Sequence, residues 1–563
     1  MKYKHRIAKQ NLLNNIMKIN SEDPEQFWKL LKKLKGDSKF SDTPIDMNTW
    51  HSHFKSLHNT PSMSNNDVKF QSHIREQLNN LLDNHNGIDT LDDKISLEEL
   101  TKTIKSLKTK KSGGPDMIKN EMIKLASPNI VKCLLRLFNA ILSTRKIPDG
   151  WSLNYIVPIF KGGCPSETGN YRGIAITSCL GKLFSSVLSN RLVKYLDHNK
   201  LIAQEQIGFR KQKRTSDHIF VIKSLVEEAK SKRKPIYGCF VDLRKAFDTI
   251  WREGLYYKML QNFHISSKYV NIIQSMYSNV KGQVKSDGKL SDIFNIAIGL
   301  RQGCNLSPQL FNMYINDLPG LLRLGKCDPV KLNDSNINML AYADDMLILS
   351  NSEKGLQKAL NILQIYCNKW QLIVNEKKTK IIVFNKTVVN SKFIYDGTQL
   401  EIVKQHTYLG LKLHQSGSFT AAIKDLVVRA QKALYGAMSM IKDTFADPRL
   451  YLKIFDGVVR PILTYCGEIW GCFGIKRKKG FPISLAFLTN LKKKFEIMHL
   501  KLCKQALHVP RRASNMATFA ELGRGPISIS ILVAMLKNYL RIIKVEDDHL
   551  VKKALHSQMK LKN

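Results

Sequence analysis

Two adjacent acidic residues interrupt an apolar part of the sequence. Asp344 and Asp345 lie between Asn338–Ala343 and Met346–Leu349, and both flanking runs have the pattern of β-strands. Adjacent carboxylates between apolar strands are costly unless cations neutralise them. At the turn of an antiparallel hairpin they would project into a cleft, where divalent metal ions could bind. Taken alone, the motif fits a plain Asp-Asp hairpin turn equally well.

A third acidic residue ends another apolar run. Asp242 follows Tyr237–Val241, a run with the composition of a buried strand. Phosphoryl transfer with two metal ions needs carboxylates from separate elements to hold the ions about 4 Å apart, where they act on the attacking 3′-hydroxyl and the departing pyrophosphate. Asp242, Asp344 and Asp345 meet this requirement. They are the predicted ligands of two Mg²⁺ ions, for which Mn²⁺ could substitute.

Strand and helix patterns alternate around these acids. Further strand-like runs occur at Tyr155–Phe160, Ile381–Phe384 and His406–Leu413. A helix begins at Ser96, where Glu99 completes a capping box, and ends within Lys110–Asp116. After Gly417 helical patterns dominate. The sequence therefore predicts an α/β (α+β) unit that contains an antiparallel hairpin, followed by a helical region.

The chain divides into three predicted parts. Near the start, Asp23 and Pro24 predict the beginning of a helix, and residues 57–69 are rich in Ser, Asn and Pro, which is typical of a linker. We expect a basic helical extension and linker over residues 1–95, the α/β unit over 96–415, and a helical, basic region over 416–563.

The charge of the chain indicates nucleic acid as its partner. Lys and Arg number 88 against 47 Asp and Glu, which gives a net charge of +41. This excess is too widely spread for a single basic tail. A basic surface binds nucleic acid because its Lys and Arg side chains neutralise backbone phosphates. The alternative is a basic protein that is merely soluble or ribosome-associated.

Cysteine usage and hydropathy indicate where the chain resides. The ten cysteines form no CxxC pair, which favours reduced thiols in an intracellular compartment. No apolar run approaches the length of a membrane span or of a signal-peptide centre. We therefore expect a soluble intracellular protein without a membrane partner, in the nucleus or the cytoplasm. One group of side chains could bind zinc, although its spacing fits no common module and buried thiols are the simpler reading. That group is Cys466, Cys472, His499, Cys503 and His508.

The order of the segments resembles the polymerase motifs of reverse transcriptases, and the whole set resembles the non-LTR (LINE-type) retrotransposon enzymes. The resemblance covers about residues 100–415. In chain order the matching segments are Ser112–Asp116, Pro158–Gly163 with Asn170–Ile174, Phe240–Asp248, Arg301–Pro308, Tyr342–Asp345, Trp370–Thr379 and Tyr408–Gly410.

The resemblance implies a right-hand polymerase fold, with fingers and palm followed by a helical thumb. It also implies RNA-directed DNA synthesis on an RNA template, by extension of a DNA primer with dNTPs. Complete LINE-type proteins usually add an endonuclease, so we expect a truncated product that lacks this portion. Two rivals remain, a group II intron-type reverse transcriptase and a catalytically silent nucleic-acid-binding remnant. Phe519–Pro526 resembles retrotransposon tails more than a maturase domain.

Further site residues come from the resemblance. Lys161 and Arg172 lie in segments that resemble the wall over the incoming nucleotide, where cations would offset triphosphate charge. Gln302 and Gly303 resemble the motif that packs against nucleotide and template, with Gly permitting close backbone approach. Lys378 could protonate departing pyrophosphate. Each assignment has a simpler alternative. Lys161 and Arg172 could form surface salt bridges, Gln302 and Gly303 could form a loop-to-helix turn, and Lys378 could be a solvated lysine.

Phe247 bears on the choice of sugar. It lies five residues after Asp242, where reverse transcriptases resemble one another in having an aromatic ring beneath the sugar, and a ring there would clash with a ribose 2′-hydroxyl. Viral RNA-dependent RNA polymerases tend to have an Asp at this spacing, able to hydrogen-bond that hydroxyl. Here the Asp is one residue further, at Asp248, which favours DNA synthesis. An ordinary core aromatic is the alternative for Phe247.

Overall fold

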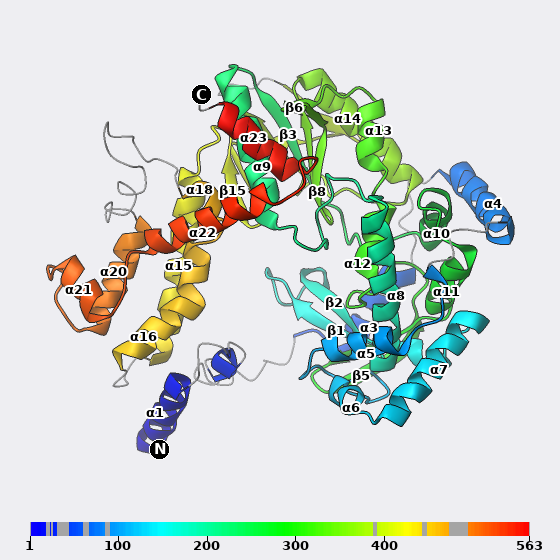
Figure 1. The fold of residues 1–563 in the computed structure, drawn as a ribbon, viewed down its shortest axis with the longest axis horizontal. Coiled ribbons are helices and arrows are strands. Elements are labelled where there is room, and N and C mark those ends of the chain that lie inside the picture. The colour runs from blue at the N-terminus through cyan, green and yellow to red at the C-terminus, as the bar shows by residue number, and fades with distance from the viewer. Residues whose placement is uncertain are drawn as a thin grey trace.

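The computed structural model describes residues 2–18, 23, 26–30, 44–59, 67–84, 91–386, 391–441, 447–471 and 494–561. Within these residues lie a five-stranded sheet, a four-stranded sheet and a long helical arm. In Figure 1 the five-stranded sheet lies above the four-stranded sheet, and the arm extends from the upper sheet on the left. The mixture of sheets and helices agrees with the predicted α/β (α+β) class.

The five-stranded sheet has its most apolar strand at the centre. Its strand order is β13-β10-β3-β9-β8, and every residue of β3 is buried. Successive side chains of β3 point to opposite faces, so Cys239 and Val241 join one apolar core while Phe240 joins a second core. Burial on both faces explains the unbroken apolar run. The strands are β3 (Ile236–Val241), β8 (Met339–Tyr342), β9 (Asp345–Ser350), β10 (Lys380–Phe384) and β13 (Glu401–Ile402).

The predicted antiparallel hairpin is confirmed. Strands β8 and β9 pair with Tyr342 opposite Asp345, so the two residues between them form the turn. Strand β3 runs antiparallel to β9, with Val241 opposite Met346. Asp242 therefore leaves β3 at the sheet edge where the hairpin turns.

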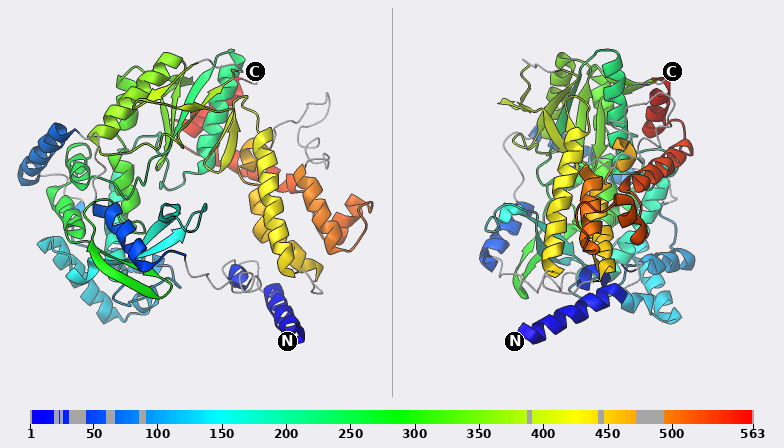
Figure 2. Two further views of the ribbon diagram at one scale, coloured as in Figure 1. Left: turned by 180° about the vertical axis from the view of Figure 1, so that it is seen from behind. Right: turned by 90° about the vertical axis from the view of Figure 1, so that its left-hand side faces the viewer.

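The four-stranded sheet, of order β2-β1-β4-β5, is covered by a helix from the N-terminal part of the chain. Helix α3 (Met47–Asn59) buries Trp50 and Phe54, four residues apart, in a cluster with residues of this sheet. Figure 2 (left) shows blue α3 beside the green hairpin of β4 and β5. The strands are β1 (Leu153–Phe160), β2 (Tyr171–Ile176), β4 (Lys281–Ser286) and β5 (Lys289–Asn295).

The linker predicted over residues 57–69 is wrong at both ends. Helix α3 continues through Asn59, and α4 begins at Val68 and runs to Asn84, while residues 60–66 lie outside the described residues. Tertiary packing overrides the polar composition here, because Ile74 and Leu78 of α4 bury themselves in the main core. Asp23 accepts a bond from the backbone N–H of Gln26 (3.0 Å), as expected for a helix start.

The helices between the strands follow the sequence signals. Helix α5 begins after Ser96, whose hydroxyl accepts a bond from the backbone N–H of Glu99 (3.1 Å), so the predicted N-cap is confirmed. The helices are α5 (Leu97–Ser106), α6 (Asn120–Lys124), α7 (Pro128–Thr144), α8 (Cys179–His198), α9 (Thr215–Ser231), α10 (Arg252–Gln261), α11 (Ser267–Ser278), α12 (Ser307–Tyr314), α13 (Leu318–Leu324) and α14 (Glu353–Lys369).

The run His406–Leu413 is a hairpin of two strands, and not one strand as its composition suggested. Strand β14 (Gln405–Tyr408) pairs antiparallel with β15 (Leu411–His414). The turn residues Leu409 and Gly410 both have positive φ, +47° and +78°, as a type I′ turn requires.

The chain ends in helices that form the arm and then return to the sheet. Apolar residues of α15 and α22 share one core with β3 and α9, which joins the arm to the five-stranded sheet, and α23 packs on α9 (Figure 1). No helix among the described residues is long and apolar enough to cross a membrane. The helices are α15 (Thr420–Ile441), α16 (Pro448–Ile454), α17 (Arg460–Leu463), α18 (Gly467–Trp470), α20 (Lys494–Ala506), α21 (Asn515–Glu521), α22 (Ile527–Ile543) and α23 (Leu550–Lys560).

Candidate active site

The three predicted acidic residues come together at one edge of the five-stranded sheet. Asp242 directly follows β3, Asp344 lies in the turn of the hairpin beside it, and Asp345 is the first residue of β9. Asp242 and Asp345 line one pocket of about 400 Å³, together with Lys378, His406 and other residues. Carboxylates from two separate elements therefore face one space.

The electrostatics of this edge disfavour bare carboxylates. Burial raises the pKa of Asp345 to about 6, and the charges of Asp344 and Asp242 contribute to this rise. Burial also raises the pKa of Asp344. The charge of Asp242 raises this pKa further, whereas the cation of Arg172 lowers it. Hard divalent cations prefer carboxylate oxygens and would relieve this repulsion. The residues present thus fit a divalent metal site, with Asp242, Asp344 and Asp345 as the ligands.

Lys161 and Arg172 lie on one face of the β1–β2 hairpin. Arg172 is paired with Ile159, and Lys161 follows two residues after Ile159, so alternation places both cations on the same side. Burial and then the charge of Arg172 lower the pKa of Lys161, while Asp248 raises it. The charges of Lys161 and Arg172 also lower the pKa of Asp344, so both cations interact electrostatically with the acidic edge of the sheet.

Phe247 is held by aromatic neighbours. Its ring stacks on Phe311 of α12, with centroids 4.6 Å apart and an interplanar angle of 17°. The ring of Phe209 meets it edge-on at 6.0 Å. Phe247 itself is only partly buried, so it packs against the core and also keeps an open side.

The adjacent Asp248 is buried and already has a partner. Its Oδ1 accepts a hydrogen bond from Nε2 of Gln302 (2.6 Å). Burial raises the pKa of Asp248 to about 6, against the opposing influence of Gln302 and Lys245. Asp248 and Gln302 thus connect the segment after β3 to the segment before α12.

Gly303 lies where no side chain fits. Its φ is +113°, and a Cβ atom there would lie 2.8 Å from the backbone oxygen of Ala175 in β2. The backbone N–H of Ala175 donates to the carbonyl of Gln302 (2.8 Å). Gln302 and Gly303 therefore tie β2, which carries Arg172, to the start of α12, and the predicted close backbone approach is to β2.

Lys378 lies in a turn bonded to Asp242 through the backbone. The N–H of Asn375 donates to the carbonyl of Asp242 (2.7 Å), and the N–H of Asp242 donates to Oγ1 of Thr379 (3.3 Å). This places Lys378 on the wall of the pocket that Asp242 and Asp345 also line. Gln371 has a φ of +52°, a left-handed conformation that Gly adopts more easily.

Sequence reasoning missed two residues of this region. His406 lines the same pocket and lies 4.9 Å from the ring of Phe240, and burial lowers its pKa. His406 and Tyr408 are two residues apart in β14, and this spacing could have predicted that both side chains lie on the same face of the strand. The other residue is Gln206, buried beside the hairpin turn, for which no local signal exists in the sequence.

The alternative zinc group is not assembled among the described residues. Burial raises the pKa of the Cys466 thiol to about 12 and that of Cys503 to about 11, while His499 stacks on Phe455. Cys472 lies outside the described residues. In the described part of the chain, the one group of three His, Cys, Asp or Glu side chains whose ligand atoms all lie within 4.8 Å of one another is Glu546, Asp548 and His549, so Asp242, Asp344 and Asp345 share the sheet edge without reaching that spacing. Lysines already contact that group, since Lys200 pairs with Glu546 and Lys213 with His549.

Part of the chain is similar to known polymerases. Residues 159–413 match the family described as "Reverse transcriptase (RNA-dependent DNA polymerase)". The chain is 27% identical over 387 residues to the RNA-directed DNA polymerase from mobile element jockey of Drosophila melanogaster. It is 28% identical over 388 residues to the probable RNA-directed DNA polymerase from transposon BS of the same species. Each match covers 67% of this chain, which spans 41% and 42% of the two relatives.

Two further similarities are weaker. The Pol polyprotein from type-1 retrotransposable element R2 of Nasonia vitripennis is 26% identical over 55% of this chain and 30% of that protein. Among solved structures, apo telomerase from Candida tropicalis, truncated from its C-terminal domain, aligns over 48% of this chain and 54% of that one, at 14% identity and a TM-score of 0.34. Residues 159–413, a little under half of the chain, are therefore similar to the reverse transcriptase family, and the named relatives that share this similarity come from mobile elements.

Proposed function

We propose that the chain is an RNA-directed DNA polymerase that extends a DNA primer by two-metal-ion nucleotidyl transfer. One observation supports this most: Asp242, Asp344 and Asp345 meet at one sheet edge, where burial and mutual repulsion favour cation binding, inside a reverse transcriptase domain. Mg²⁺ is the proposed ion at both positions, with Mn²⁺ as a substitute. The RNA template, the DNA primer and the dNTPs are the proposed partners.

The right-hand architecture follows as part of this proposal. The five-stranded sheet would be the palm, and the four-stranded sheet with its helices would be the fingers that carry Lys161 and Arg172. Helices from α15 onward would be the thumb, beside the hairpin of β14 and β15. The proposed boundaries are residues 1–95 for the extension, 96–415 for fingers and palm, and 416–563 for thumb and C-terminal region.

Each side chain has a defined part in binding and orientation. Lys161 and Arg172 bind the triphosphate from the β1–β2 hairpin and turn its α-phosphorus toward the primer. Phe247, fixed from below by Phe311, lies under the sugar and excludes a 2′-hydroxyl. Gln302 supports the position of Phe247 through its hydrogen bond to the adjacent Asp248. When bound, the divalent ions would activate the 3′-hydroxyl and neutralise the developing charge.

Lys378 is the proposed proton donor to pyrophosphate. Its turn is bonded to the backbone of Asp242, so the ammonium group lies on the pocket wall near the acids. A positioned lysine can supply a proton to a leaving oxygen as it departs. This role is separate from that of Lys161, which binds the triphosphate.

The test is primer extension with defined template and nucleotide classes. On poly(rA) with an oligo(dT) primer and Mg²⁺, the chain should incorporate dTTP and should discriminate strongly against UTP. A chain that binds the primer–template in a gel-shift experiment, yet extends it on neither RNA nor DNA, would instead be the silent nucleic-acid-binding remnant. Incorporation of UTP at the rate of dTTP would contradict the proposed sugar selection.

A further inference from the structure

The segment before Phe209 lies along the outer edge of the catalytic hairpin. The backbone N–H of Ala341 donates to the carbonyl of Glu205 (2.8 Å), and the N–H of Ile207 donates to the carbonyl of Ala341 (3.0 Å). Gln206 and Ala341 thereby form a parallel bridge. Since β8 is the edge strand of its sheet, this segment covers an edge that would otherwise be open next to the catalytic turn.

The side chain of Gln206 holds the turn itself. Its Oε1 accepts hydrogen bonds from the backbone N–H groups of Ala343 (2.9 Å) and Gly208 (2.8 Å). Its Nε2 donates to the carbonyl of Ala343 (3.3 Å). Gln206 is only 2% exposed, so these bonds form away from water. One amide therefore binds both backbone polar groups of the residue that precedes Asp344.

Ala343 is a residue that needs such support. Its φ is +56°, in the left-handed region that is unfavourable for a residue with a Cβ atom. A two-residue hairpin turn requires positive φ at its first position, which Gly or Asn usually fills. A strained conformation of this kind persists only when the surrounding structure enforces it.

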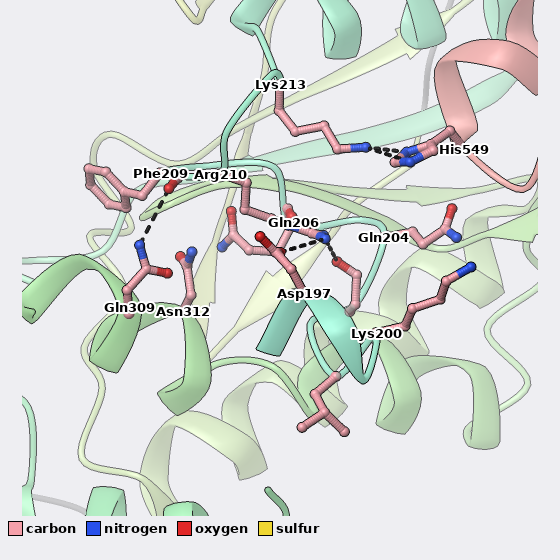
Figure 3. Close-up of polar contacts among 12 residues, drawn as sticks. Asp197, Lys200, Gln204, Gln206, Phe209, Arg210, Lys213, Gln309, Asn312 and His549 are labelled. Atoms are coloured by element: carbon pink, nitrogen blue, oxygen red, sulfur yellow. Dashed lines mark hydrogen bonds and ion pairs between the residues drawn. The ribbon is translucent and has the colours of Figure 1, made fainter. Parts of the chain in front are cut away.

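Gly208 allows the segment to approach this closely. A Cβ atom on Gly208 would lie 2.3 Å from the backbone nitrogen of Ala343, so a side chain there would push the turn away. Asn312 of α12 donates through Nδ2 to the carbonyl of Gly208 (2.8 Å) and fixes the segment from the other side. Figure 3 shows Gln206 in the segment that also carries Phe209 and Arg210, with Asn312 and Gln309 on the neighbouring helix.

We propose that Gln206 is a positioning residue that holds the turn at Ala343 in the conformation that aims Asp344 and Asp345 at the metal ions. This inference rests on the proposed function, because it concerns the same metal site. Gln206 touches neither metal nor substrate. It acts through the backbone of Ala343, in the way that outer partners orient the groups that ligate a metal.

The experiment measures Mn²⁺ affinity of the full chain without primer or nucleotide, by electron paramagnetic resonance of free Mn²⁺. Gln206→Met keeps the length of the side chain and removes all three hydrogen bonds. It should weaken Mn²⁺ binding about 10- to 100-fold, the usual effect of removing an outer partner. Gln309→Met is the matched control, because Gln309 donates to the carbonyl of Phe209 (3.4 Å) on the same segment. It should change Mn²⁺ affinity less than about 2-fold.

A second variant separates positioning from general packing. Ala343→Gly removes the cost of positive φ, so the turn should need Gln206 much less. Adding Gln206→Met to Ala343→Gly should therefore weaken Mn²⁺ binding only about 2- to 3-fold, well below its effect in the wild-type chain. If Gln206→Met alone proves unstable, this comparison within the Ala343→Gly background still decides, because a large loss there contradicts positioning.

The outcomes are distinguishable from failure of the proposed function. Equal losses in both backgrounds, or unchanged affinity in a folded Gln206→Met chain, would overturn the inference without contradicting the proposed function of the wild-type chain. Asp344→Asn identifies the site, because Mn²⁺ binding that survives this change lies elsewhere and would overturn both proposals. Mn²⁺ binding that behaves as expected in a chain that extends no primer would contradict the proposed function alone.

Discussion

At the scale of single residues, Phe247 is the side chain through which the chain would choose its sugar. Phe247→Val should raise UTP incorporation relative to dTTP, because the ring would no longer occupy the space that a 2′-hydroxyl needs. We expect some loss of dTTP efficiency as well, since the ring would no longer bridge Phe311 and the deoxyribose. The measurement is the ratio of kcat/KM values for UTP and dTTP at one Mg²⁺ concentration. An unchanged ratio would make Phe247 a core aromatic.

Asp248 should make stability depend on pH. Its pKa is raised from 3.8 to about 6 by burial, so its contribution to folding stability is present below about pH 4 and is lost as pH rises through 6. A shift of about two pH units corresponds to about 3 kcal/mol. Asp248→Asn keeps an oxygen for Nε2 of Gln302 and removes the charge. Its free energy of unfolding relative to wild type should therefore rise by about 2–3 kcal/mol from pH 4 to pH 7.5. A difference that is flat over this range would contradict the burial of this charge.

The acidic residues were predictable from sequence because their signal is local. Two acids between apolar strands, and one acid after a third strand, indicate a metal site once the motifs are seen in order. Gln206 gave no such signal, because its role arises only when a segment more than a hundred residues earlier folds against Ala343. The contacts of Asp248 with Gln302 and of Phe247 with Phe311 could not be predicted for the same reason, because each joins segments far apart in the sequence.

At the scale of elements, the return of the C-terminal helices to the sheet should be a main source of stability. Arg541 of α22 forms an ion pair with Asp217 at the start of α9, where both side chains are largely buried. Arg541→Ala leaves a buried carboxylate without its partner and should cost about 3 kcal/mol. Arg449→Ala is the matched control, because its pair with Asp447 is exposed and should cost less than about 1 kcal/mol. Denaturant unfolding of both variants gives the comparison, and equal costs would contradict the proposed difference.

Elements with an unbroken apolar run were the easiest to predict. Strand β3 and the β8–β9 hairpin appear within a residue or two of their expected bounds, since burial on both faces leaves little choice of composition. Helix α4 was missed because its apolar positions are separated by polar residues typical of loops. The hairpin of β14 and β15 was predicted as one strand because its turn contains one Gly and otherwise apolar residues.

At the scale of the whole molecule, the net charge of +41 should dominate nucleic-acid binding. Contacts to phosphates release counterions, so affinity should fall about 10³-fold or more between 50 and 200 mM salt. The loss should be nearly the same for two duplexes of unrelated sequence, because phosphates carry no sequence information. Fluorescence anisotropy across a salt series measures both. A flat salt dependence would contradict binding through the basic surface.

The central claim is that Asp242, Asp344 and Asp345 hold the metal ions for DNA synthesis. It is tested most directly by single-turnover extension of an oligo(dT) primer on poly(rA), by wild type and by Asp242→Asn and Asp344→Asn. Asp396→Asn is the control, since Asp396 lies in the turn between β11 (Ile394–Tyr395) and β12 (Thr398–Gln399). Wild type and Asp396→Asn should extend the primer, while both active-site variants should keep their fold and lose extension, because coordination needs the charge. Extension at the wild-type rate by either active-site variant would contradict the account.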